Sequence, residues 1–230
     1  MWVHRWSWLV VAAALALGAT ACSKSASDLG DPQTVIDTAQ QKLEDTSGVT
    51  LTLTTDDLPD GVQGVQGADG TVTDAPAFEG TLTAVISAGS FPVPITAVGG
   101  KVYAKIPLTF GYSEVDPGDY GAPDPALLLS ADQGIPAILA ATTGLQKGDD
   151  VRGGQDNKEV LTTYTGKVPE SAAAHLIPGA TGEFDATYGI TSDGELRTAK
   201  LTGVFYSGKP AMTYSMTVDD YGTSKDITAP

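Results

Sequence analysis

Cys22 is the only cysteine in the 230-residue chain, and its surroundings make its thiol the first candidate for chemistry. The small residues Gly18–Ala21 precede it, and they follow an apolar run, Trp6–Leu17, and a start that contains Arg5. A basic start, about a dozen apolar residues and a small-residue site predict a secretory signal peptide over residues 1–21. The apolar run is shorter than the roughly 20 residues that a transmembrane helix needs.

The residues before Cys22 allow two kinds of processing. They resemble a bacterial lipobox, whose cysteine is acylated on sulfur, although Ala19 stands where a lipobox usually has Leu. Ala19-Thr20-Ala21 also fits the cleavage site of an ordinary secreted protein, which would leave a free thiol. We expect acylation, because an exposed thiol in an oxidising compartment is a liability, and acyl chains would anchor the protein on the outer face of the cell membrane. Residues 22–31 would then form the lipidated N-terminus and a polar tether.

The other polar side chains form no catalytic or metal-binding pattern. His175 is the only histidine after the predicted signal peptide, whereas zinc sites need several His or Cys ligands. The sequence has no G-x-S-x-G nucleophile motif and no G-x-x-x-x-G-K-[ST] phosphate loop. Acidic pairs such as Asp149-Asp150 lack EF-hand spacing, and no pattern places two carboxylates together for glycoside chemistry. We therefore expect no catalytic residue, no metal and no cofactor.

Composition narrows the class of protein further. Removal of residues 1–21 would leave 209 residues with a net charge of −16, because Arg5 is the only charged residue removed. This acidic balance argues against nucleic acid as a partner, since nucleic-acid-binding proteins present a basic face. The mature length can build one well-cored domain, which we expect over residues 32–230.

Hydrophobic periodicity and turn residues predict the elements that would form this domain. Asp31-Pro32 and four apolar residues at helical spacing (Val35, Ile36, Ala39 and Leu43) predict a helix that ends by Gly48. Alternating apolar residues predict strands at Val49–Thr54, Phe78–Ile86, Phe91–Ala97, Lys101–Ile106, Val160–Lys167, Glu183–Thr191, Leu196–Tyr206 and Ala211–Asp220. Short helices are expected at Ala126–Leu129, Ile135–Thr143 and Pro169–Leu176, and a mobile acidic loop at Asp56–Asp74. Pro92 and Pro94 predict an edge or an interrupted pairing.

These elements predict one α+β domain, an antiparallel sheet with its helices gathered on one face. Their order resembles that of the LppX/LprA/LprF/LprG family of actinobacterial lipoproteins, with LprG as the most similar member. The shared features are Cys22, Gly80-x-Leu82-x-Ala84-x-Ile86, Gly100-x-x-Tyr103-Ala104, Asp124-Pro125, Gly134, Leu139 and Gly166-Lys167-Val168. The acidic Asp56–Asp74 segment departs from the family pattern.

The resemblance implies a single curved sheet, a half-barrel, whose concave face and helices enclose an apolar cavity. Members like LprG bind triacylated glycolipids and triacylglycerol and help to move them across the envelope, often beside a major-facilitator exporter. We therefore expect an acylated lipid or glycolipid as ligand, the membrane as a partner through Cys22, and such an exporter as a further partner. The expected cavity residues are Leu82, Ala84, Ile86, Val93, Ile95, Leu128, Ile138 and Leu139.

Periodicity alone leaves a second interpretation open, because cores and lipid pockets are lined by the same residue types. Small residues such as Ala84, Gly134 and Ala137, and an aromatic content of only 7%, favour a sheet that its own side chains leave partly unfilled. If the core were instead filled, the chain would be a non-transporting envelope lipoprotein, a scaffold or a partner of an exporter. A lipid- or sugar-acting enzyme is the third alternative.

Overall fold

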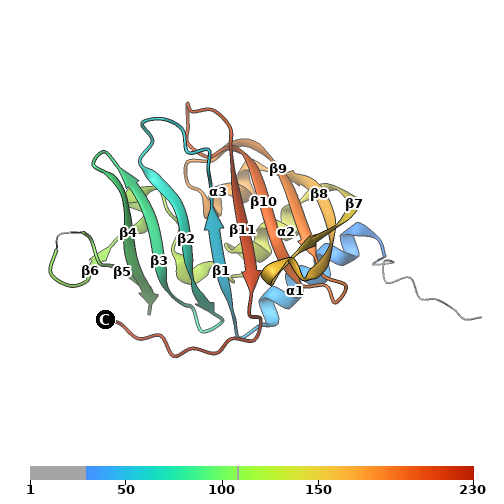
Figure 1. Ribbon diagram of the computed structural model, residues 1–230, viewed down its shortest axis with the longest axis horizontal. Helices are drawn as coiled ribbons and strands as arrows, with labels where there is room; N and C mark the ends of the chain where they lie inside the picture. Colours follow the sequence, from blue (N-terminus) through green and yellow to red (C-terminus); the bar gives the residue numbers. More distant parts are fainter. Residues whose placement is uncertain (1–29, 108) are drawn as a thin grey trace, which may run out of the picture.

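The computed structural model describes residues 30–107 and 109–230, so the predicted signal peptide, Cys22 and most of the tether lie outside the described residues (Figure 1). The strands are β1 (Gly48–Thr54), β2 (Gly64–Thr73), β3 (Ala77–Ile86), β4 (Gly89–Val98), β5 (Lys101–Ala104), β6 (Ser113–Val115), β7 (Thr143–Gly153), β8 (Glu159–Val168), β9 (Thr181–Ile190), β10 (Leu196–Val204) and β11 (Met212–Asp219). The α-helices are α1 (Pro32–Asp45), α2 (Ile135–Ala141) and α3 (Glu170–Leu176), and the 3-10 helices are η1 (Pro117–Tyr120), η2 (Pro125–Leu127) and η3 (Gln155–Asn157).

All the described strands belong to one open antiparallel sheet in the order β6-β5-β4-β3-β2-β1-β11-β10-β9-β8-β7. The sheet therefore consists of two meanders, one that runs from β1 outward to β6 and one that returns from β7 inward to β11. The pairing of β1 with β11, from Thr50 opposite Asp219 to Thr54 opposite Ser215, joins the first and last strands at the centre. The segments between β6 and β7 supply α2 and both η1 and η2.

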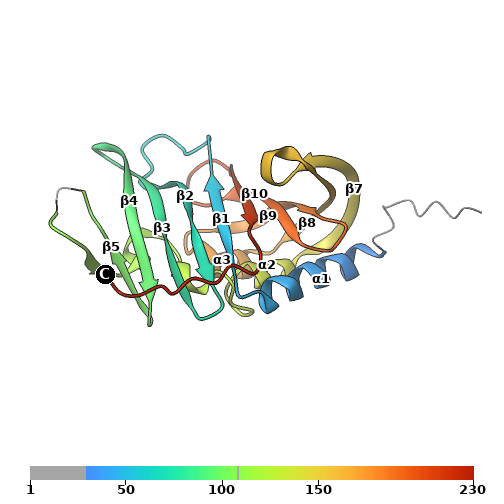
Figure 2. The ribbon, with the colours of Figure 1, turned by 60° about the horizontal axis from the view of Figure 1, so that its bottom comes forward.

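The sheet curves as a half-barrel, and α1, α2 and α3 lie on its concave side (Figure 2). The predicted α+β class and half-barrel architecture are thus confirmed. Helix α1 buries the four apolar residues that the helical spacing predicted: Val35, Ile36, Ala39 and Leu43. These side chains join a continuous core with α2 and with residues of β8 to β11, where the largest fully buried side chains are aromatic: Tyr164, Tyr188, Phe184 and Phe205.

Three strands arise where the sequence predicted none: β2, β7 and the short β6, which pairs with β5. The segment Asp56–Asp74 was expected as a mobile loop, but β2 occupies Gly64–Thr73 and pairs along its length with both β1 and β3. Its ten residues include three Gly and one Asp, a weak strand propensity that the pairing on both sides overrides. Strand β7 is mostly exposed and lies at the edge of the sheet, and its two register shifts against β8 hide its alternation.

The middle of the chain is less helical than predicted. Of the two apolar helices expected there, α2 forms, but Ala126–Leu129 contributes only the end of the single turn η2, and the chain then folds back. In the segment between η2 and α2 the Ile135 N–H donates to the Leu128 carbonyl at 2.8 Å. The backbone passes so close that a Cβ at Gly134 would lie 2.7 Å from the Leu127 carbonyl oxygen.

The two prolines of β4 lie at a locally unpaired edge, as predicted. Strand β5 pairs with β4 only over Ile95–Val98, so in the described part of the chain no strand pairs with the outer side of the half that holds Pro92 and Pro94. One hydrogen bond, from the Lys105 N–H to the Pro94 carbonyl at 2.9 Å, closes this side. Prolines are tolerated there because that strand edge needs no further donors.

Candidate functional site

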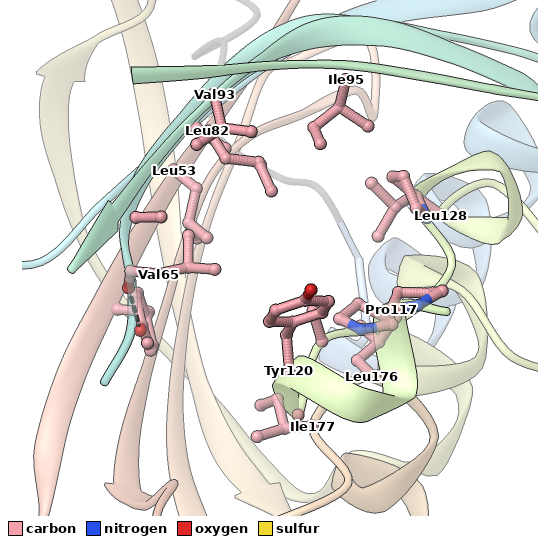
Figure 3. A pocket seen from close by; sticks show the side chains of 18 of the residues that line it. Leu53, Val65, Leu82, Val93, Ile95, Pro117, Tyr120, Leu128, Leu176 and Ile177 are labelled. Carbon is pink, nitrogen blue, oxygen red and sulfur yellow. Dashed lines mark hydrogen bonds between the residues drawn. The ribbon is translucent and has the colours of Figure 1, made fainter. Parts of the chain in front are cut away.

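A cavity of about 640 Å³ lies between the concave face of the sheet and the segments from η1 to α3. Its volume falls within the roughly 300–1,000 Å³ typical of small-molecule sites. From the sheet side Figure 3 shows Leu53, Val65, Leu82, Val93 and Ile95, and from the facing side Pro117, Tyr120, Leu128, Leu176 and Ile177. Side chains from both meanders line it, because residues of β10 and β11 complete the wall that β1 to β5 begin.

Strand alternation explains how β3 and β4 supply one wall. Leu82 lies opposite Val93, and Ala84 lies opposite Phe91, in the antiparallel register of the two strands. Residues opposite each other project to the same face of a sheet, so all four side chains line the cavity. Ala84 is small and leaves room where a larger side chain would fill the space.

The facing wall depends on the close turn that joins η2 to α2. This turn holds Leu128 and Ile135 beside each other through their backbone hydrogen bond, and both side chains line the cavity. Ile138, one turn further along α2, lines it as well. The segment Ala126–Leu129, which was predicted as a helix, therefore presents Leu128 to the cavity from a tight turn instead.

Seven of the eight residues expected in the cavity line it: Leu82, Ala84, Ile86, Val93, Ile95, Leu128 and Ile138. Leu139 is not among the lining residues, and the expectation for it was wrong. Its side chain is fully buried in the core.

The mouth of the cavity is marked by apolar residues that are partly exposed. Ile86, at the end of β3, is 45% exposed, and Tyr120 of η1 is 65% exposed, yet both line the cavity. Ile106, just beyond β5, is 37% exposed and also lines it. An apolar ligand could therefore enter between the ends of β3 and β5 and the turn η1.

Several lining residues were missed by the sequence analysis. Val65 lies in the segment predicted as a loop, and Tyr206, Tyr214 and Met216 come from the end of β10 and from β11. The alternation of Met212, Tyr214 and Met216 along the predicted last strand was a usable signal for an inward face. No local signal indicated that this strand pairs with β1, which is what brings Tyr214 to the cavity.

The cavity wall carries little charge and no cation. Among the described residues that line it, Asp69 and Asp119 are the only ones with charged side chains, and none is Lys, Arg or His. Burial raises the pKa of Tyr188 to about 12, although its hydroxyl bonds with the Thr142 hydroxyl at 2.8 Å. Burial is the main cause that raises the pKa of Tyr214, and its hydrogen bond with Tyr206 raises this pKa further. These tyrosines are neutral at physiological pH, so the site can hold a long apolar group.

Two further features bear on the site. Within residues 30–107 and 109–230, no group of three or more His, Cys, Asp or Glu side chains is arranged to hold a metal ion. None of the helices described in these ranges has the length and apolar character required to span a bilayer.

The model of the LppX_LprAFG lipoprotein family matches residues 31–228 of this chain. The crystal structure of LprF from Mycobacterium bovis superposes with a TM-score of 0.68 at 15% identity, over 87% of this chain and 99% of that one. The structure of LppX from Mycobacterium tuberculosis gives a TM-score of 0.63 at 20% identity, over 86% of this chain and 100% of that one. At these identities the two structures establish the shared fold. No curated protein sequence matches the chain.

Proposed function

The chain belongs to the LppX_LprAFG lipoprotein family, and we propose that it is a membrane-anchored carrier that holds the acyl chains of a lipid in its cavity. The observation that carries the proposal is the open apolar cavity between sheet and helices, with Leu82, Val93 and Leu128 in its walls. In this function the acylated Cys22 tethers residues 32–230, as a single lipid-binding domain, to the outer face of the cell membrane. Triacylated glycolipids or triacylglycerol are the proposed ligands.

The energetics suit a carrier better than a permanent store. Two long acyl chains contain on the order of 30 methylenes, and burial of each stabilises the complex by roughly 0.8 kcal/mol relative to water. The gross figure of about 24 kcal/mol is largely offset, because a lipid that leaves a bilayer gives up the same apolar burial there. A small net difference lets the protein take lipid from one membrane and release it into another. We propose that an exporter of the major-facilitator type supplies the direction.

Catalysis is not part of the proposed function. The wall of the cavity presents mostly apolar side chains and neutral tyrosines beside Asp69 and Asp119, and none of the described lining residues is a Ser, Cys or His that could act as a nucleophile or its base. Binding of acyl chains requires shape and apolar area, both of which the wall provides.

The test is to purify the full chain from membranes of a bacterial host, extract it with organic solvent and analyse the extract by mass spectrometry. A carrier is expected to release non-covalently bound acyl lipid in roughly stoichiometric amount. Protein that yields no lipid, even after incubation with glycolipid or triacylglycerol vesicles, would contradict the proposal. Specific capture of an exporter by such lipid-free protein would instead favour the scaffold role.

A further inference from the structure

Two tyrosine hydroxyls in the wall of the cavity are hydrogen-bonded to each other. Tyr214 of β11 donates its hydroxyl proton to the backbone carbonyl of Val65, and the hydroxyls of Tyr206 and Tyr214 lie 3.2 Å apart. All three residues line the cavity, and Figure 3 shows Val65 on its sheet side. A polar part of a ligand that lies against this part of the described wall would therefore meet the two hydroxyls.

The direction of these hydrogen bonds follows from the number of protons. A carbonyl oxygen only accepts, so the single hydroxyl proton of Tyr214 is committed to Val65. Tyr206 must then donate its own proton to the Tyr214 oxygen, which leaves only lone pairs on the Tyr206 oxygen. A ligand group that bonds to Tyr206 in this arrangement must supply the proton, as a hydroxyl does and an ester carbonyl does not.

The position of the Tyr206 hydroxyl depends on Gly64. A Cβ on Gly64 would overlap the Tyr206 hydroxyl, and it would lie 2.8 Å from the ring carbon that bears this hydroxyl. The missing side chain of Gly64, the first residue of β2, thus makes the space that the hydroxyl occupies. Alanine at this position would have to displace the tyrosine ring.

The charged residues in the wall of the cavity disfavour a phosphate group on the ligand. Asp69 and Asp119 line the cavity, and no Lys, Arg or His side chain lines it in the described residues. Lys209, on the turn after Tyr206, is exposed and donates to the Asp60 carbonyl at 3.3 Å. A phosphate that entered the cavity would lose water and would find no cationic side chain among the described lining residues.

We propose that the Tyr206 oxygen accepts a hydrogen bond from a free hydroxyl of an uncharged lipid. Of the proposed ligands, glycolipids with a free hydroxyl next to their acyl chains are then preferred over triacylglycerol, which has none. Acylglycerols with a free hydroxyl are likewise preferred over lipids whose phosphate must enter the cavity. This inference rests on the proposed function, because it names the part of the ligand that the same cavity recognises.

The experiment measures binding of three probes to the full chain in detergent: 1,2-dioleoylglycerol, triolein and dioleoyl phosphatidic acid. Dioleoylglycerol is expected to bind more tightly than the other two. Tyr206→Phe removes the acceptor and is expected to weaken dioleoylglycerol binding about fivefold, the effect of one hydrogen bond, while triolein binding is unchanged. Gly64→Ala is expected to weaken it similarly, because it displaces the hydroxyl without removing it.

Tyr112→Phe is the matched control, because this exposed tyrosine is not among the lining residues. If Tyr206→Phe keeps the full preference for dioleoylglycerol while both proteins unfold at the same denaturant concentration, the inference is overturned and the tyrosine pair only supports β2. Equal binding of the three probes by the unaltered protein overturns it as well, and leaves the proposed function standing. Failure to bind any probe overturns both.

Discussion

Gly70 of β2 lies directly opposite Gly80 of β3, and the ring of Phe78 covers both residues. A Cβ on Gly70 would come within 2.5 Å of the Phe78 ring, and a Cβ on Gly80 within 2.7 Å of it. The glycine pair thus lets a buried aromatic ring lie flat on the sheet at the cavity floor, since Gly70 and Phe78 are both lining residues. This arrangement gives the two glycines a packing role within the sheet.

Gly80→Ala is expected to destabilise the protein by about 1–3 kcal/mol, the typical effect of overpacking a close contact. The new Cβ would overlap the backbone carbonyl of Asp69 and lie 2.7 Å from the Gly70 Cα, so β2 and β3 would have to separate. Urea unfolding followed by circular dichroism measures the change. Thr81→Ala, at the next position of β3, is the control, and equal stability of the two variants would show that the contact is readily relieved.

Leu82→Trp is expected to abolish most lipid binding while the protein still folds. Leu82 projects into the cavity, so the indole can occupy the space that the acyl chains need. Co-purified lipid, measured by mass spectrometry, is expected to fall about tenfold or more, which corresponds to only about 1.4 kcal/mol of binding free energy. Val160→Trp, on an exposed part of β8, should retain the lipid. A folded Leu82→Trp protein with normal lipid content would place the ligand elsewhere.

Tyr188 is expected to make stability depend on pH in the alkaline range. Burial raises the pKa of this tyrosine from 10.0 to about 12, so between these values the unfolded chain loses the proton that the folded protein keeps. Its contribution is complete below about pH 10 and is lost as the pH rises toward 12. At about pH 11 the loss is about 1.4 kcal/mol.

Tyr188→Phe isolates this contribution from that of the other buried tyrosines. In the variant the Thr142 hydroxyl keeps its hydrogen bond to the Ile138 carbonyl at 2.8 Å, so the fold should survive. Free energies of unfolding in urea at about pH 9 and about pH 11 are compared for both proteins. The decrease between the two pH values should be smaller in the variant by about 1.4 kcal/mol. An unchanged decrease would mean that Tyr188 ionises normally in the folded protein.

Cys22→Ser is expected to prevent acylation and to release the protein from the membrane fraction. In the proposed lipidation the thiol would accept the acyl-bearing group, and two or more acyl chains are needed for stable anchoring. Incorporation of labelled palmitate and fractionation of the cells measure both effects, with Ser23→Ala as a control that should keep label and location. Palmitate labelling that persists in Cys22→Ser would contradict the lipobox assignment.

Local patterns along the chain were sufficient for most of the elements. The helical spacing of Val35, Ile36, Ala39 and Leu43 predicted the buried face of α1, and the alternation through Leu82 and Ala84 predicted the inward face of β3. Such patterns are informative because each residue's burial depends on the period of its own element. The cavity residues themselves were expected from the family resemblance, and seven of the eight line the cavity.

The sequence by itself determined the element types with strong periodicity, the acidic and β-rich character, and the single cysteine after a small-residue site. Only the tertiary structure decided that the first strand pairs with the last, that β2 is a strand, and that the sheet leaves a hollow instead of a filled core. Pairing between residues as distant as Thr50 and Asp219 has no local signature. A cavity and a core are built from the same apolar residues. The distinction therefore depends on where the two walls are held, and the turn at Gly134 positions the wall that faces the sheet.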